Sequence, residues 1–196
     1  MISLETPRLK LDAVTAANAA VLWRIMQGAH LREFQDIPRF TRDEFERRVA
    51  QRPKQFHARA IGRFEWLVSL ADSRRPIGWV SLRIGEQMRG AAEAGYSLLA
   101  PYRGQGYATE AVGAMVDAAF RESDLSRVDA CCVPENATSR RVLERLGFRE
   151  GKMQKSGAVV RGRAVDIVVY EFKREQWQAQ LGSANSILIP ASSKPK

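Results

Sequence analysis

A short turn with two glycines, between a predicted strand and a predicted helix, constrains this chain more than any other stretch. The segment 93–99 is predicted to be a strand, and apolar residues recur at helical spacing from Ala108 to Phe120. Gly104 and Gly106 lie in the turn between them. Such a turn leaves backbone N–H groups unpaired at the start of a helix, where the helix dipole favours negative charge, and glycines let a bulky anion approach closely. We therefore expect a site for a phosphate or pyrophosphate group there.

The residues around these glycines exclude two common phosphate-binding loops. No lysine lies near them, so they do not form the Gly-x-x-x-x-Gly-Lys-Ser/Thr loop of nucleoside triphosphatases. Tyr107, Ala108 and Thr109 follow Gly106, so the dinucleotide-binding pattern Gly-x-Gly-x-x-Gly is broken. Instead, Arg103-x-x-Gly106-x-Ala108 resembles the Arg/Gln-x-x-Gly-x-Gly/Ala signature of the GNAT N-acetyltransferases. The longer string Tyr-Arg-Gly-Gln-Gly-Tyr-Ala-Thr-Glu-Ala resembles the RimJ/RimL-like branch of that family.

A second stretch, about thirty residues further on, carries the same resemblance. Residues 136–148 match Asn-x-x-Ser-x-Arg-x-Leu-Glu-x-Leu-Gly-Phe, which is typical of the RimJ/RimL-like branch. From the residues alone, Asn136 and Ser139 are interpreted as caps of the helix that starts there, and Gly147 as its end. Because the two motifs follow in the expected order and spacing, the resemblance extends over residues 6–177.

The resemblance implies a mixed α/β (α+β) fold in a single domain that covers residues 1–181. Such a domain has a central β-sheet of about seven strands, flanked by about four helices and splayed at the cofactor site. The patterning of the chain agrees, since a meander of predicted strands is followed by strand–loop–helix units. Thr41 and Glu44 form a predicted capping box at the start of a helix over 42–52. Residues 182–196 are rich in small polar residues and are expected to form a flexible tail.

By the same resemblance, the cofactor is acetyl-CoA, whose pyrophosphate would lie in the glycine turn. In this family the strand before the turn separates from its neighbour, and its exposed backbone pairs with the pantetheine arm. A backbone N–H there would stabilise the oxyanion of the reaction. The residues that the resemblance assigns to cofactor binding lie at the end of the strand, in the turn and at the start of the later helix: Leu98, Leu99, Arg103, Gly104, Gln105, Gly106, Tyr107, Ala108, Thr109, Asn136, Ser139 and Arg140.

Acetyl transfer to an amine requires a neutral attacking nitrogen and a place for the leaving thiolate. Glu93 occupies the strand position at which many family members carry a base, and its alternative interpretation is a surface residue paired with an arginine. A carboxylate is a weak base for an ammonium group, so burial or a water relay has to assist it. Many GNAT enzymes carry a tyrosine acid four residues before the Gly of Gly-Phe, where this chain has Leu143. The resemblance then offers Ser139 as the donor to the thiolate, while Tyr107 and Tyr170 are expected to pack.

The sequence does not identify the acceptor amine. Similar chains acetylate the N-terminal amine of ribosomal proteins or small-molecule amines. The segment from about His30 to Arg63 would form one wall of the acceptor pocket, and four of its residues are expected to line it: Phe34, Asp36, Phe40 and Phe56. An acidic side chain, Asp36 or Glu33, would suit a cationic acceptor. Homodimers are common among similar chains, but the sequence does not decide the oligomeric state.

Two other interpretations compete with the transferase. A net charge of +9 suggests a nucleic-acid-binding protein. The charges are dispersed, however, without a basic stripe interleaved with aromatic residues, so we do not expect direct nucleic-acid recognition. The other interpretation is a GNAT scaffold that binds acyl-CoA as a sensor or interaction module without turnover, and Leu143 keeps it open.

The cysteines, histidines and apolar segments are those of an ordinary cytoplasmic protein. Cys131 and Cys132 are adjacent on a predicted strand, so they face opposite sides and no disulfide is expected. His30 and His57 do not have metal-ligand spacing, and no metal is expected. The first residues have neither a basic region nor a long apolar run, and no stretch is long enough to span a membrane. We therefore expect neither a signal peptide nor a membrane anchor.

Overall fold

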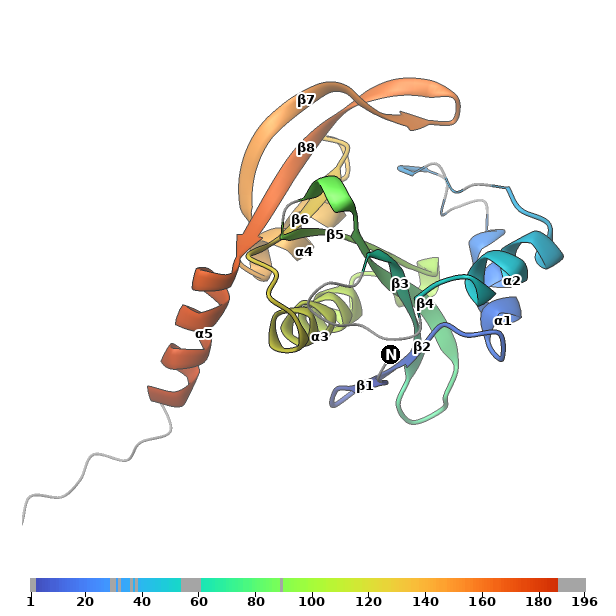
Figure 1. The fold of residues 1–196 in the computed structure, drawn as a ribbon, viewed down its shortest axis with the longest axis horizontal. Helices are drawn as coiled ribbons and strands as arrows, with labels where there is room; N and C mark the ends of the chain where they lie inside the picture. The colour runs from blue at the N-terminus through green and yellow to red at the C-terminus, as the bar shows by residue number, and fades with distance from the viewer. Residues whose placement is uncertain are drawn as a thin grey trace, which may run out of the picture.

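The computed structural model of the chain describes residues 3–28, 31, 33–35, 37, 39–53, 61–88 and 90–186. Within them, eight strands form one sheet in the order β1-β2-β3-β4-β5-β6-β8-β7 (Figure 1). The strands are β1 (Leu4–Glu5), β2 (Leu9–Ala13), β3 (Gly62–Leu70), β4 (Pro76–Ile84), β5 (Ala91–Leu98), β6 (Arg127–Cys132), β7 (Arg149–Val160) and β8 (Arg163–Lys173). The helices in the same residues are α1 (Ala19–Met26), α2 (Arg42–Ala50), α3 (Tyr107–Glu122), α4 (Ala137–Arg145) and α5 (Arg174–Ser186), with short 3-10 turns η2 (Glu86–Met88) and η3 (Ala100–Tyr102).

This topology confirms the predicted mixed α/β fold. β5 and β6 are parallel, and the other neighbouring pairs of the described sheet are antiparallel. Two counts differ from the expectation, because the described residues form eight strands and five α-helices rather than about seven and about four. The additional strand is β1, whose two residues are too few to show an alternating pattern. A short terminal helix is expected to start at residues 173–177, and α5 is that helix, but it runs through Gly182 to Ser186, into the expected tail. Residues 187–196 of that tail lie outside the described residues.

Alternate residues of the central strands face two separate cores. Phe64, Trp66 and Val68 of β3 are buried in the main core, together with apolar residues of α3 and α4. Leu67 of the same strand and Trp79 of β4 point to the other face, where residues of α1 and α2 cover them. Helices α3 and α4 therefore pack on one face of the sheet, and α1 and α2 pack on the other (Figure 1).

β5 and β6 separate part-way along their length. Residues 91–94 pair in parallel with residues 127–130. Beyond that point, β5 stays paired with β4 as far as Leu98, and β6 stays paired with β8 as far as Cys132. Each strand is held by its outer neighbour, so the sheet opens between the two at the end that leads into α3 and α4. This opening is the splay that the family resemblance implies.

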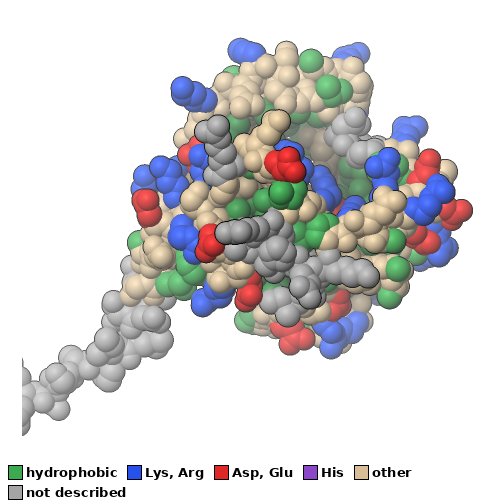
Figure 2. All heavy atoms as spheres, viewed as in Figure 1, with side chains coloured by type: hydrophobic (Ala, Val, Ile, Leu, Met, Phe, Trp, Pro, Cys, Tyr) green, Lys and Arg blue, Asp and Glu red, His purple; other side chains and the backbone are tan. Residues whose placement is uncertain are grey.

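The β7–β8 hairpin curves out of the plane of the sheet, and α1 and α2 lie on the other side of the molecule (Figure 1). The surface between the hairpin and the α1–α2 side is hollowed, with Lys or Arg side chains inside the hollow (Figure 2). Cys131 is exposed, Cys132 is buried, and both are free thiols. In the part of the chain that the structure describes, no helix is both long and apolar enough to cross a membrane.

Candidate active site

The turn between β5 and α3 has a backbone that glycine adopts without strain. Gly104 and Gly106 have φ of 76° and 81°, in the left-handed region. Gly106 is the N-cap residue of α3, and no side chain caps the helix there. The first backbone N–H groups of α3, from Tyr107, Ala108 and Thr109, therefore lack partners within the helix. A Cβ at Gly104 would meet nothing within 4 Å, so the turn is open on that side, as an anion site requires.

Arg8 brings a guanidinium group to this turn, and no motif of the sequence indicates that contact. Its Nη1 donates a hydrogen bond to the carbonyl of Gln105 (3.0 Å), and the guanidinium lies 4.6 Å from the ring centre of Tyr107. Glu110 of α3 holds Arg8, since it accepts from Arg8 Nε at 2.6 Å and from Thr6 Oγ1 at 2.6 Å. Burial alone would raise the pKa of Glu110, but the hydrogen bonds from Thr6 and Arg8 outweigh it and lower that pKa.

Several residues expected to bind the cofactor brace the turn itself. Arg103 Nε donates to the carbonyl of Leu98 (3.1 Å), and Gln105 Nε2 donates to the carbonyl of Pro101 (2.9 Å). The side chain of Leu98 is buried in the main core. The backbone N–H of Leu99 donates to a carbonyl of β4 (2.8 Å). These contacts fix the path of the chain from the opening between β5 and β6 to the start of α3.

Polar side chains from β5 and α4 meet where β5 and β6 separate. The hydroxyl of Tyr96 on β5 lies 2.7 Å from Ser139 Oγ in the first turn of α4. Burial raises the pKa of Tyr96 above its usual value, so the phenol keeps its proton. Asn136 Oδ1 accepts a hydrogen bond from the backbone N–H of Ser139 (3.0 Å), which is the capping role that the residues alone predict. Tyr96 was not among the expected site residues, although its place two residues before Leu98 puts both on one side of the strand.

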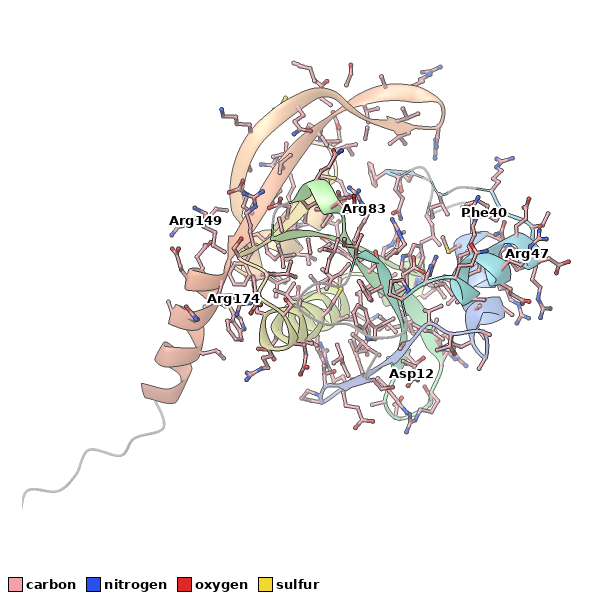
Figure 3. All side chains as sticks on the ribbon, in the orientation of Figure 1. Asp12, Phe40, Arg47, Arg83, Arg149 and Arg174 are labelled. Atoms are coloured by element: carbon pink, nitrogen blue, oxygen red, sulfur yellow. The ribbon has the colours of Figure 1, made fainter. Side chains whose placement is uncertain are left out.

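Glu93 belongs to a row of charged side chains that crosses the sheet. Six residues on neighbouring strands occupy successive register positions on one face: Arg63, Arg83, Glu93, Asp129, Glu171 and Arg149. Glu93 forms an ion pair with Arg83, which Figure 3 labels, and lies beside Asp129. Burial raises the pKa of Asp129, although Arg127 pairs with it at 2.7 Å. Glu93 lies next to the last paired residue of β5, at the edge of the opening.

Arg140 points toward β7 and β8. Its Nε donates to the Tyr170 hydroxyl (3.0 Å), and its Nη2 donates to Glu150 (2.9 Å). These hydrogen bonds raise the pKa of Arg140. Tyr170 is fully buried and donates its own proton to Glu150 (2.9 Å), so it packs as predicted. The network holds α4 against the β7–β8 hairpin.

The expected acceptor wall is described in part. Phe34 is partly buried, and its neighbour Gln35 donates from Nε2 to Ser97 Oγ on β5 (3.0 Å). Phe40 packs against the core on the α1–α2 face of the sheet, and the centre of its ring lies 4.3 Å from Cζ of Arg48. The segment before α2 is therefore tied to β5 near the opening. Glu33, the alternative acidic side chain, is exposed. Asp36, Phe56 and both histidines, His30 and His57, lie outside the described residues.

Comparison with known proteins assigns the chain to a family. A model of the acetyltransferase (GNAT) domain matches residues 8–149. This chain belongs to the GNAT family. A protein of Bacillus licheniformis named "Uncharacterized N-acetyltransferase p20" is 27% identical over 178 residues, which are 90% of this chain and 99% of that protein.

Solved structures of acetyltransferases share the fold. The ribosomal-protein-S5-alanine acetyltransferase of Vibrio fischeri superimposes with a TM-score of 0.78 at 23% identity, over 90% of this chain and 99% of that chain. RimL, a ribosomal L7/L12 alpha-N-protein acetyltransferase in complex with coenzyme A, superimposes with a TM-score of 0.77 at 20% identity. The superposition with RimL covers 89% of this chain and 99% of the RimL chain.

The chain is thus an N-acetyltransferase of the GNAT family, whose acyl donor is acetyl-CoA. The site fits that molecule, because the uncapped start of α3 and the open space at Gly104 suit a pyrophosphate. The edge of β5 that no longer pairs with β6 suits the amide groups of the pantetheine arm. Among the described residues, no group of three or more His, Cys, Asp or Glu side chains is placed to hold a metal ion.

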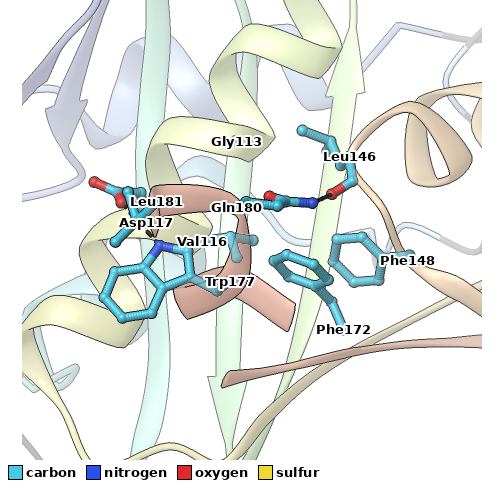
Figure 4. Close-up of a pocket in the computed structure, with 9 residues that line it drawn as sticks. All are labelled: Gly113, Val116, Asp117, Leu146, Phe148, Phe172, Trp177, Gln180 and Leu181. Atoms are coloured by element: carbon cyan, nitrogen blue, oxygen red, sulfur yellow. Dashed lines mark hydrogen bonds between the residues drawn. The ribbon is translucent and has the colours of Figure 1, made fainter. Parts of the chain in front are cut away.

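A small pocket lies apart from this GNAT site, between α3, α4, β8 and α5 (Figure 4). Its volume is about 190 Å³, and mostly apolar side chains line it: Gly113, Val116, Asp117, Leu146, Phe148, Phe172, Trp177, Gln180 and Leu181. No residue of the glycine turn lines it, and neither does Tyr96 or Ser139. The pocket is therefore not part of the site that fits acetyl-CoA.

Proposed function

We propose that this GNAT enzyme transfers the acetyl group of acetyl-CoA to a primary amine by direct attack within a ternary complex. The observation that supports the proposal is that the opening between β5 and β6 is continuous with the glycine turn. The opening between β5 and β6 leads along β5 directly into the glycine turn and the uncapped start of α3. One extended ligand can therefore lie with its phosphates at the helix and its thioester in the opening, in reach of side chains from β5 and α4.

Backbone groups carry most of the proposed binding. The N–H groups of residues 104–109 hold the pyrophosphate, and Arg8 adds a positive charge beside them. Leu98 contributes its backbone N–H to the pantetheine arm, whereas Leu99 acts by position because its N–H and carbonyl are bonded to β4 and Tyr102. A backbone N–H in the opening stabilises the oxyanion. The other expected residues act by position: Arg103 and Gln105 brace the turn, and Asn136 and Arg140 orient α4.

Two side chains carry the proposed proton handling. Glu93 takes the proton that the attacking nitrogen loses, directly or through a water molecule. Its ion pair with Arg83 fixes the carboxylate at the edge of the opening. Ser139 donates a hydrogen bond to the sulfur that receives the electron pair when the carbon–sulfur bond breaks. Because a thiolate is a good leaving group, positioning of these groups accelerates the reaction without strong acid catalysis.

The proposed acceptor is a protein N-terminal amine, with a small-molecule amine as the alternative. The names of the two superimposed enzymes support the first, since both describe acetyltransferases of ribosomal proteins. The row that contains Glu93 and Asp129 lies on the same face of the sheet as α1 and α2. The carboxylates of this row would attract an ammonium group. A sensor without turnover is the second candidate, because Leu143 is fully buried and offers no donor to the thiolate.

The test measures binding and turnover separately. Thermal unfolding with and without acetyl-CoA reports binding, and a screen of peptides with free N-termini and of small amines reports turnover. Binding with turnover supports the transferase, and Glu93→Gln should then remove turnover without weakening binding. Binding without turnover on any amine favours the sensor, and no binding contradicts both candidates.

A further inference from the structure

The phenol of Tyr96 lies where β5 leaves β6. Tyr96 is two residues beyond Ala94, the last residue of β5 that pairs with β6, and its backbone pairs with Val80 of β4. Because side chains alternate along a strand, Tyr96 faces the same side as Ala94 and Leu98. Its hydroxyl lies 2.7 Å from Ser139 Oγ and 3.2 Å from the Ser139 carbonyl oxygen. The phenol therefore joins β5 to the first turn of α4 beside the opening.

Either hydroxyl could be the donor across the 2.7 Å contact: if Ser139 donates, the phenol proton goes to the Ser139 carbonyl at 3.2 Å, and if Tyr96 donates, the serine proton is directed elsewhere. Tyr96 has one proton to donate, and Ser139 Oγ is the nearer acceptor, at the usual O–H···O distance. The Ser139 carbonyl is farther away and is also the acceptor position of an α-helical turn. When Tyr96 donates to Ser139 Oγ, the proton of the serine hydroxyl is directed to a third group.

The Cys132 thiol of β6 is one candidate for the third group, because Ser139 is among the groups that affect its pKa. Burial raises the pKa of the Cys132 thiol to about 11, and a hydrogen bond from Ser139 is the smallest of the causes that act on it. Cys132 is the last residue of β6. Tyr96, Ser139 and Cys132 therefore follow one another from β5 to β6. To reach the sulfur of coenzyme A in the opening, the single proton of the serine hydroxyl has to turn from Cys132 to the ligand.

The other three tyrosines of the chain have different contacts. The Tyr170 hydroxyl binds Glu150 and an arginine of α4. The Tyr102 hydroxyl lies 3.4 Å from an arginine between β3 and β4, and the Tyr107 ring lies under the arginine that precedes β2. Tyr96 is thus the tyrosine whose hydroxyl reaches the opening.

We propose that Tyr96 is a positioning residue of the acetyl-transfer site, which orients the Ser139 hydroxyl so that its proton faces the departing sulfur. The inference rests on the proposed function, in which Ser139 hydrogen-bonds that sulfur. A nitrogen–carbon bond forms, the carbon–sulfur bond breaks with its electron pair on sulfur, and the nitrogen loses its proton to Glu93. The sulfur accepts the Ser139 hydrogen bond and takes its proton from water on release. Tyr96 keeps its own proton throughout.

Coenzyme A, which ends in the same sulfur as a thiol, is the probe for the test. The ultraviolet absorbance of the thiolate gives the pKa of this thiol when it is bound to the full chain. A hydrogen bond donated to the thiolate lowers that pKa. We expect Tyr96→Phe and Ser139→Ala each to raise it by about 0.5 to 1, a three- to tenfold change in the ionisation constant, and the double variant to raise it no further. Tyr102→Phe, which loses a phenol hydroxyl elsewhere, should leave it unchanged.

Four outcomes would overturn the inference. If Ser139→Ala raises the thiol pKa and Tyr96→Phe does not, Tyr96 does not orient the serine and the proposed function stands. If the two effects add in the double variant, Tyr96 acts independently of Ser139. If the wild-type chain does not bind coenzyme A, both the inference and the proposed function fail. Should Tyr96→Phe not fold, 3-fluorotyrosine at this position keeps the ring and donates more strongly; it should lower the thiol pKa, and an unchanged value refutes the inference.

Discussion

Replacing Gly104 with aspartate places a negative charge where the pyrophosphate is proposed to bind. A Cβ at this position meets nothing within 4 Å, so the new side chain fits, and its carboxylate lies beside the start of α3. At a separation of about 5 Å, two unit charges repel by roughly 0.8 kcal/mol in water and by about 3 kcal/mol at an effective dielectric constant of 20. Because a pyrophosphate carries more than one charge, we expect Gly104→Asp to weaken acetyl-CoA binding by about tenfold to several hundredfold.

Gly162→Asp is the matched control. Gly162 lies in the turn between β7 and β8, has φ of 74° compared with 76° at Gly104, and also has nothing within 4 Å of a Cβ. The two variants therefore share the backbone strain of a side chain at positive φ and the same change in net charge. Because the two positions differ in their distance from the start of α3, a difference in binding reports the charge beside that helix end.

Thermal unfolding gives the magnitude directly. At a ligand concentration about 100 times the wild-type Kd, binding stabilises the fold by about 2.7 kcal/mol. For a chain of 196 residues, this raises Tm by about 6–7 °C. A variant with a 100-fold weaker affinity gains only about 0.4 kcal/mol, or about 1 °C, while Gly162→Asp keeps the full rise. Equal rises in both variants would refute the phosphate-binding role of the turn.

Three further predictions address the base, the Arg8 contact and the Glu110 network. Glu93→Gln should lower kcat by about 100-fold or more while the Kd for acetyl-CoA from calorimetry stays within about twofold, and an unchanged kcat would exclude Glu93 as the base. Arg8→Ala should weaken coenzyme A binding by about three- to tenfold, with a loss that shrinks as ionic strength rises; a salt-independent loss would indicate a structural role. The folded-state pKa of Glu110 is lowered from its usual 4.5, so its charged form stabilises the fold above pH 4.5, and this is lost as pH falls through the folded pKa. Urea unfolding between pH 7 and 3 should therefore show a smaller acid loss of stability in Glu110→Gln than in the wild type, and equal losses would contradict the shift.

The sequence by itself determined the features that depend on neighbouring residues. Positive φ at Gly104 and Gly106 follows from residue type, since the turn needs a backbone that other residues adopt with strain. The capping box of Thr41 and Glu44 and the cap at the start of α4 depend on residues three positions apart. The two motifs of the family also lie within short stretches, so the fold class and the cofactor followed from them.

Only the tertiary structure decided which distant residues meet. Arg8 reaches the carbonyl of Gln105, 97 residues away, and Tyr96 reaches Ser139, 43 residues away. Such pairs depend on the order and register of the strands, which the spacing of residues within a short stretch does not predict. A slip of one residue in β5 would exchange the faces of Glu93 and Tyr96 and separate both from their partners. The long-range burial of apolar faces sets that register, and with it the side chains that stand around the opening between β5 and β6.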